Sequence, residues 1–281
     1  MIRIPVDRDA LRAAIDRIAP TWWTLAEAAT RENIAAGAHL KNRDGIWSRV
    51  KAAFVDLQKG KCGYCERRLG NAGIEWDMEH YRPKNEVKSW KAGGTNPADV
   101  GGASKVGYFR LAFDVRNYLV ACKPCNTIYK SSWFPTGAAR RLDTGEPSEL
   151  RTESPFLINP ADPGDTDPER LIHFRGVVPQ VTGAPGPDRQ RALATIELLK
   201  LAEREDLLHE RAQIIVGVWF AFESSRASEE EQRERARKNL EVLCSDRGAH
   251  ADCARHFLRL CHDAPAEAAR EADRALALLV R

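Results

Sequence analysis

The chain has 281 residues, of which 43% are hydrophobic and 30% are charged. This composition is typical of globular proteins and excludes fibrous and intrinsically disordered classes. The formal net charge of +3 is nearly balanced, so any affinity for a nucleic acid would have to come from a local basic patch. The length predicts one large domain or two modest ones.

The predicted elements change in character along the chain. Residues 1–60 carry apolar side chains at helical spacing and predict an N-terminal helical segment. Residues 61–136 combine short strand-like pieces, two cysteine pairs and a glycine-rich loop at 92–107. Residues 137–187 predict an irregular connector with brief strands at 156–158 and 171–174, and residues 188–281 return to helical periodicity. We therefore expect an α+β fold that is mostly α-helical.

No stretch of the sequence predicts a membrane segment. Residues 1–9 contain acidic side chains and no apolar run that a secretion machinery would recognise. The longest apolar stretch, residues 214–222, is far shorter than the roughly 20 residues that span a bilayer. We expect a cytoplasmic protein with no membrane partner, in which the seven cysteines bind metal or pack in a core.

Two C-x2-C pairs carry the strongest signal in the sequence. Cys62 with Cys65, and Cys122 with Cys125, each have the spacing of a knuckle that presents two thiolates to one zinc ion. Chance would produce two such pairs only about once in a hundred sequences of this composition. We predict one structural zinc held by all four cysteines, and the alternative is four unrelated core thiols.

Side chains suited to phosphodiester hydrolysis lie between and just after these pairs. Glu79 and His80 fall between the pairs, Asn117 precedes the second pair, and Asn126 follows its last cysteine. A neutral His80 could take a proton from water at physiological pH. Glu79 and Asn126 offer hard oxygen ligands that suit Mg²⁺ or Mn²⁺ better than zinc. Taken singly, a Glu-His pair is usually solvated and an asparagine usually belongs to a turn.

This order of an acidic residue, a histidine, an asparagine and C-x2-C-Asn resembles the HNH, or ββα-metal, nuclease motif. The resemblance implies that His80 ends the first strand and that Asn126 begins the following helix. It also implies that Glu79 and Asn126 bind the catalytic metal and that Asn117 braces the loop carrying the histidine. We thus expect a zinc-clamped ββα-metal (HNH) finger inserted between helical segments.

Basic and aromatic side chains surround the motif. The expected phosphate contacts are Arg82, Lys84, Lys123 and Lys130, interleaved with Tyr81, Trp90, Tyr108 and Tyr129. Together they form the local patch that the net charge does not reveal. The alternative for any single cation is an ordinary solvated surface position.

Longer stretches narrow the resemblance. Residues 61–66, 79–84, 117–122, 125–130 and 134–135 resemble the HNH subunit of Septu-type and retron-associated anti-phage systems, with weaker similarity at 157–160 and 194–199. In that family the nuclease works beside an ABC-type ATPase, so the resemblance implies such a partner. The sequence departs from the family pattern at Ser131, where we expect glycine, and in the unusually glycine-rich loop at 92–107.

We therefore predict a metal-dependent HNH endonuclease that hydrolyses DNA in anti-phage defence, with structural Zn²⁺ and catalytic Mg²⁺ or Mn²⁺. The alternatives are a zinc-finger module that binds nucleic acid or protein without catalysis, and an HNH-type RNase. A pure binding module would not need Glu79, His80 and Asn126. The cysteines and histidines at residues 244–262 are spaced as core positions on a helix, so we assign no second zinc site there.

Overall fold

The computed structural model describes residues 1–41, 45–70, 73–91, 93, 97–183 and 185–280. Helices predominate and the strands form two separate antiparallel pairs, so the fold is α+β as predicted. Part of the predicted glycine-rich loop at residues 92–107 lies outside the described residues. Among the helices described, none combines the length and the apolar character needed to cross a membrane.

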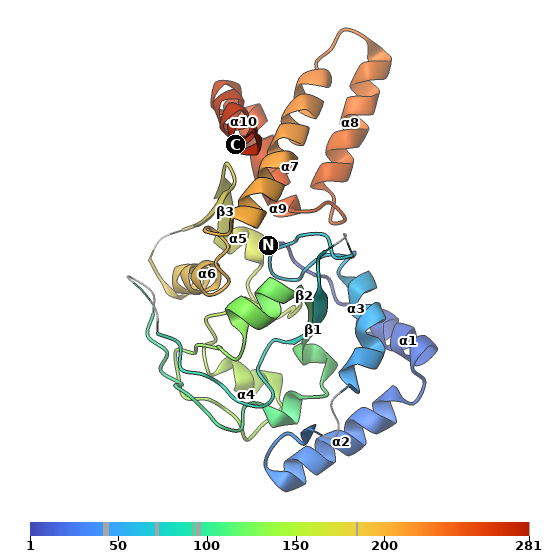
Figure 1. The fold of residues 1–281 in the computed structure, drawn as a ribbon, viewed down its shortest axis with the longest axis vertical. Helices are drawn as coiled ribbons and strands as arrows, with labels where there is room; N and C mark the ends of the chain where they lie inside the picture. The colour runs from blue at the N-terminus through green and yellow to red at the C-terminus, as the bar shows by residue number, and fades with distance from the viewer. Residues whose placement is uncertain (42–44, 71–72, 92, 94–96, 184, 281) are drawn as a thin grey trace.

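The N-terminal segment is helical, as the periodicity predicts. It consists of α1 (Arg8–Ile18), α2 (Trp22–Ala36), the short 3-10 helix η2 (Trp47–Val50) and α3 (Lys51–Leu57). The carboxylate of Asp7 caps α1 by accepting from the backbone N–H groups of Asp9 and Ala10. Gly37 ends α2 in a left-handed conformation with φ of 65°, which glycine adopts without steric cost. In Figure 1 these helices lie together on one side of the first strand pair.

The first strand pair is the centre of the predicted finger. Strands β1 (Trp76–His80) and β2 (Tyr118–Cys122) are antiparallel, with Trp76 opposite Cys122 and His80 opposite Tyr118. Two short 3-10 helices, η3 (Phe109–Leu111) and η4 (Val115–Asn117), precede β2, and the π-helical segment η5 (Pro124–Lys130) follows it. Every residue of β2 is buried, so the strand packs on both faces.

The connector contains α4 (Pro147–Arg151), α5 (Pro168–Leu171) and the hairpin of β3 (Ile172–Arg175) with β4 (Val178–Val181). The strand predicted at 171–174 is therefore present, shifted by one residue. The prediction of a strand at 156–158 is wrong. Those residues are buried, but the backbone N–H of Ile158 donates to the Thr195 hydroxyl at 3.0 Å instead of to a neighbouring strand. Their apolar run reflected burial and not sheet pairing.

Five helices complete the chain: α6 (Pro187–Leu198), α7 (Glu205–Ser224), α8 (Glu230–Cys244), α9 (Ala251–Asp263) and α10 (Pro265–Leu279). One buried apolar cluster extends from Met1 to Leu207, and a second lies within α7 to α10. Cys253 and Cys261 are fully buried in the second cluster. The bundle of α7 to α10 projects from one end of the molecule (Figure 1). The first cluster contains residues from both sides of the boundaries expected after residues 60, 136 and 187. These domain boundaries remain predictions.

Candidate functional site

The two cysteine pairs come together beside β2. Cys62 and Cys65 lie in a turn held to this strand by a hydrogen bond from the Gly63 N–H to the Val120 carbonyl at 3.0 Å. Cys122 ends β2 and Cys125 lies in η5. The four sulfur atoms are buried and lie within 4.8 Å of one another, with 3.7 Å between those of Cys65 and Cys122. Tetrahedral zinc at a Zn–S distance of about 2.3 Å sets its sulfurs about 3.8 Å apart, so the cluster fits a zinc ion.

Two arginines near this cluster, one inside the predicted finger and one outside it, contact the start of α7. Arg204, directly before α7, donates from Nη1 to the Cys125 sulfur at 3.2 Å, and its guanidinium lies over the Tyr129 ring. Arg67 forms ion pairs with Asp206 and Glu210 of α7. Sequence reasoning missed Arg204, because a contact across 79 residues leaves no local pattern.

Glu79 is buried and paired with a cation from η5. Its Oε1 lies 2.5 Å from Lys130 Nζ and accepts a hydrogen bond from the Tyr64 hydroxyl at 3.4 Å. Lys130 Nζ also donates to the carbonyl oxygen of His80 at 2.9 Å. Burial raises the pKa of Glu79 above its usual value, although the charge of Lys130 opposes that shift. The pair therefore ties η5 to the end of β1.

His80 is the last residue of β1, which is where the nuclease resemblance puts it. Its Nε2 lies 2.9 Å from the carbonyl oxygen of Ala112. Because a carbonyl can only accept, Nε2 carries the proton and Nδ1 keeps its lone pair. The rings of Trp47 and Tyr118 pack edge-on against the imidazole. Burial, and then the nearby charge of Lys84, hold the pKa of His80 well below its ordinary value, so the ring is neutral at physiological pH.

Asn117 holds the backbone that follows His80. Its Oδ1 accepts from the Arg82 N–H at 2.7 Å, and its Nδ2 donates to the carbonyls of Arg82 at 3.0 Å and Leu111 at 3.2 Å. Its own carbonyl accepts from the Tyr81 N–H at 2.9 Å. The side chain is buried and its bonds all go to backbone groups of neighbouring loops. These bonds connect the backbone at Arg82 to that at Leu111.

Asn126 reaches from η5 toward β1. Its Nδ2 lies 3.5 Å from the Met78 carbonyl, and no bond to Oδ1 occurs in the described part of the chain. Asn126 thus contacts Met78, the residue before Glu79 in β1, and the side chains of Glu79 and Asn126 carry one carboxylate and one amide oxygen. Apart from the four cysteines, the described residues hold no group of three or more acidic, histidine or cysteine side chains whose ligand atoms are close enough to hold one metal ion. The donor set fits Mg²⁺, which often binds through one or two carboxylates and keeps several waters. Such an ion would share Glu79 with Lys130.

The four expected phosphate contacts occupy two kinds of position. Arg82 and Lys130 are buried, and carboxylates of Glu153 and Glu79 hold their charged groups. Burial therefore argues against the direct phosphate contact expected for these two residues. Lys123 is exposed and paired with Glu75. Lys84 lies beside the histidine, with its ammonium 4.3 Å from the centre of the Trp47 ring.

These features define an α+β protein in which a buried four-cysteine cluster and a neutral histidine lie at opposite ends of one short strand pair. The chain is homologous to the Septu protein PtuB, which confirms the Septu-type resemblance of its motifs. It is 29% identical to the Septu protein PtuB of Bacillus mycoides (strain KBAB4) over 168 residues, which cover 59% of this chain and 50% of that relative.

A second Septu protein PtuB, from Bacillus thuringiensis, is 28% identical over 89 residues, which cover 31% of this chain and 26% of the relative. The chain therefore matches half or less of the length of these curated relatives. No protein-family model matches the chain, and no solved structure matches it.

Proposed function

We propose that this chain is a metal-dependent HNH nuclease that hydrolyses phosphodiester bonds in DNA and acts in anti-phage defence. The observation that carries the proposal is the protonation state and position of the His80 ring. The ring is neutral, the Ala112 carbonyl fixes its tautomer, and it ends a strand whose other end lies beside a zinc-type cluster. The homology to the Septu protein PtuB supports the defence role.

Each residue has a distinct part in the proposed reaction. His80 accepts a proton at Nδ1 from the water that attacks the phosphorus atom, and Ala112 keeps the ring in orientation. Glu79 and Asn126 hold Mg²⁺ or Mn²⁺, which when bound neutralises charge on the phosphate and the leaving oxygen. Lys84 and Lys123 contact the nucleic-acid backbone. Asn117 positions the loop through the Arg82 backbone and touches no substrate.

Cleavage assays with matched histidine variants test this proposal. The wild type, His80→Ala and His209→Ala would be incubated with plasmid DNA, linear DNA and RNA, in Mg²⁺, Mn²⁺ or EDTA. His209 is the matched control because it is exposed on α7. We expect metal-dependent DNA cleavage that falls about 100-fold or more in His80→Ala alone. Equal cleavage by His80→Ala would remove His80 from the mechanism, and cleavage of RNA alone would favour the RNase.

We further propose that Cys62, Cys65, Cys122 and Cys125 hold one structural zinc. Four-thiolate sites contribute on the order of 10 kcal/mol or more of apparent binding free energy, so losing one ligand should unfold the finger. Cys125→Ser should lower bound zinc to near zero and expose residues 61–136 to proteolysis. Cys244→Ser, at a half-buried position in α8, is the control. Stoichiometric zinc with wild-type protease resistance in Cys125→Ser would exclude the four-cysteine site.

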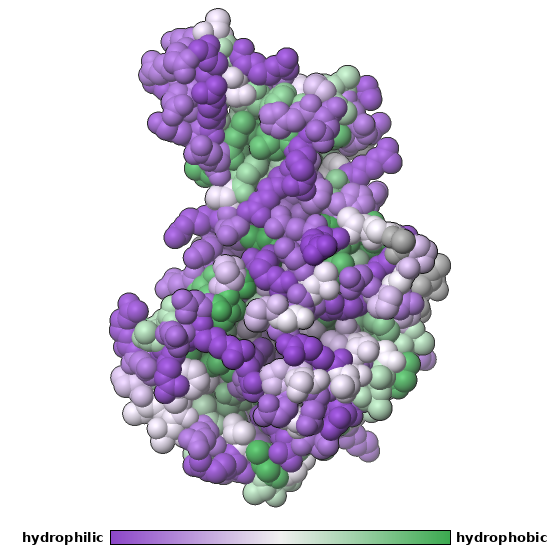
Figure 2. Space-filling model, turned by 180° about the vertical axis from the view of Figure 1, so that it is seen from behind, coloured by the Kyte–Doolittle hydropathy of each residue, from purple (hydrophilic) through white to green (hydrophobic). Residues whose placement is uncertain are grey.

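We propose that an ABC-type ATPase controls the nuclease by docking on the projecting bundle. Phe220 and Val242, whose exposed fractions are 60% and 67%, line a groove of about 460 Å³ between α7 and α8. Figure 2 shows hydrophobic surface in this upper part of the molecule, bordered by hydrophilic side chains. Exposed apolar surface of this kind is characteristic of interaction sites.

Co-expression with an ATPase encoded by a neighbouring gene would test the partner. The tagged wild type should copurify with it, and a Phe220→Glu, Val242→Glu double variant should not. Ile18→Glu is the matched control, because Ile18 is an exposed apolar residue on α1, away from the bundle. Copurification of the double variant at the wild-type level would exclude the groove. Wild-type cleavage that is equally fast without partner and ATP would exclude regulation.

A further inference from the structure

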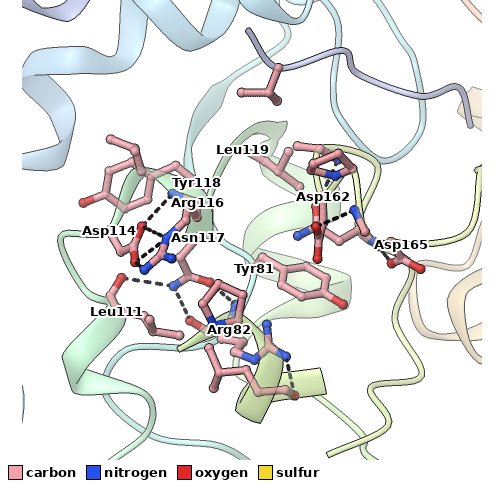
Figure 3. Close-up of a pocket in the computed structure, with 18 of the residues that line it drawn as sticks. Tyr81, Arg82, Leu111, Asp114, Arg116, Asn117, Tyr118, Leu119, Asp162 and Asp165 are labelled. Carbon is pink, nitrogen blue, oxygen red and sulfur yellow. Dashed lines mark hydrogen bonds and ion pairs between the residues drawn. The ribbon is translucent and has the colours of Figure 1, made fainter. Parts of the chain in front are cut away.

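A second cavity, of about 760 Å³, lies beside the histidine-bearing loop, and neither Glu79 nor His80 lines it. Its walls come from α1, α3, the η4–β2 segment and the connector. Figure 3 shows Asn117 and Arg82 in one wall, so this cavity and the candidate catalytic loop share a boundary. The volume lies within the roughly 300 to 1,000 Å³ of typical small-molecule sites. None of the roles proposed above uses this space.

The inner surface of the cavity is largely apolar and aromatic. Val6, Trp23, Leu57 and Val115 line it and are partly exposed, whereas the lining residues Phe54, Tyr118 and Leu119 are at most 2% exposed and present almost no surface. The Tyr81 hydroxyl donates to the Leu157 carbonyl at 2.5 Å, so its polar end is already satisfied. This surface therefore suits the apolar or ring-shaped body of a ligand.

Two charged pairs in the walls are closed to a ligand. Arg116 donates to the carboxylate of Asp114 from Nε at 3.0 Å, and also from Nη2. Arg191 pairs with Asp165 and donates to the Pro155 carbonyl at 3.0 Å. In Figure 3, Asp114 and Arg116 lie on one side of the space, and Asp162 and Asp165 on the other. These pairs shape the cavity and add little net charge.

The exposed edge of the cavity carries three loosely held guanidinium groups. Arg8 contacts no carboxylate within the described residues. Arg12 is 62% exposed, and its only carboxylate contact among the residues that the structure describes is at 4.0 Å to Asp16, which does not line the cavity. Arg151 is half exposed and lies 3.5 Å from Asp162. The carboxylates of Asp9 and Asp162 oppose these three cations, so among the described lining residues at this edge positive charge exceeds negative charge by one.

We propose that this cavity binds a small organic anion. The apolar or aromatic body of the ligand lies against Trp23, Leu57 and Val115, and its carboxylate or phosphate meets Arg8, Arg12 and Arg151. A nucleoside monophosphate and a medium-chain carboxylate both have this chemistry. The proposal is independent of the nuclease function, because it uses none of the residues assigned to catalysis or to zinc.

Titration with 1-anilinonaphthalene-8-sulfonate, an aromatic sulfonate that fluoresces in apolar sites, tests the proposal on the full chain. We expect saturable binding of one probe per chain and at least 10-fold weaker binding to the double variant Arg8→Glu, Arg12→Glu. Arg17→Glu, on the same helix but outside the cavity, should bind within twofold of the wild type. Both arginines of the double variant are exposed, so circular dichroism should show an unchanged fold. Equal affinity in the double variant, or no saturable binding, would overturn the proposal.

Displacement of the probe identifies the kind of anion. Adenosine monophosphate and decanoate would each be added to the preformed complex of probe and wild-type chain. Displacement by the nucleotide alone assigns a phosphate-bearing ring ligand, and displacement by decanoate alone assigns an acyl carboxylate. Displacement by both establishes a general site for apolar anions. If neither displaces the probe, the proposal is overturned.

Discussion

Arg204 Nη1 donates a hydrogen bond to the sulfur of Cys125 at 3.2 Å, and the arginine side chain is almost completely buried. A zinc ion with four thiolates carries two net negative charges, which are costly to bury without a compensating cation. The guanidinium supplies that cation from outside the finger. Its second contact, to Asp206, fixes its orientation at the start of α7.

Replacing Arg204 should therefore weaken zinc binding without removing a ligand. We expect Arg204→Ala to lower zinc affinity about 10- to 100-fold, as is usual when a group bonded to a metal ligand is lost. Competition with a chromophoric chelator measures the affinity. Arg226→Ala, at a largely exposed arginine beyond the end of α7, is the control. Unchanged affinity in Arg204→Ala would mean that the bond to Cys125 is incidental.

Asn117 should stabilise the loop after His80. Asn117→Ala removes three buried hydrogen bonds, each worth about 1 kcal/mol, so we expect the free energy of unfolding to fall by about 2 to 3 kcal/mol. Urea denaturation measures this loss. Hydrogen exchange at the Arg82 amide should accelerate in the same variant, because its acceptor is gone. Asn126→Ala, with one long side-chain bond, should cost less. Unchanged exchange at Arg82 would contradict the brace.

Ser131 stands where the family pattern predicts glycine, and its backbone is strained. Its φ of 45° with ψ of −129° lies in a region that residues with a Cβ rarely adopt. Ser131→Gly should therefore raise the free energy of unfolding by about 1 kcal/mol. Ser132→Gly is the matched control and should be neutral or destabilising, because Ser132 has no positive φ. A Ser131→Gly variant less stable than the wild type would contradict this explanation.

His250 should make stability depend on pH. Burial lowers its pKa below the ordinary value of 6.5, although the bonded carboxylate of Glu210 opposes the shift. Below about pH 6.5, His250 binds a proton in the unfolded chain but stays neutral in the folded chain. The free energy of unfolding therefore falls as pH decreases below this point, and the contribution of His250 is constant above it. The slope of unfolding free energy between pH 7.5 and 5.5 should be smaller in His250→Asn, with His209→Asn as the control. An equal slope in His250→Asn would exclude this contribution.

The sequence predicts the parts of the site that depend on local spacing. The cysteine pairs, the strand end at His80 and the helices on both sides follow from short patterns, because neighbours in the chain determine them. The pairing of Glu79 with Lys130 was not predictable in this way. Lys130 looked like one more surface cation, whereas the fold buries its ammonium against a carboxylate 51 residues earlier in the sequence. The strand prediction at residues 156–158 was wrong for a related reason. An apolar run indicates burial but does not show whether a strand or a helix packs against it.

Helix α7 belongs to both apolar clusters. Leu207 in its first turn packs in the first, whereas Ala212, Ile215 and Val218 pack in the second. Its 20 residues form one uninterrupted rod of about 30 Å. Helix α7 therefore connects the projecting bundle to the part of the chain that holds the cysteine cluster. Arg204, the residue directly before this helix, donates to Cys125, so one continuous helix links the outer bundle to the sulfur cluster.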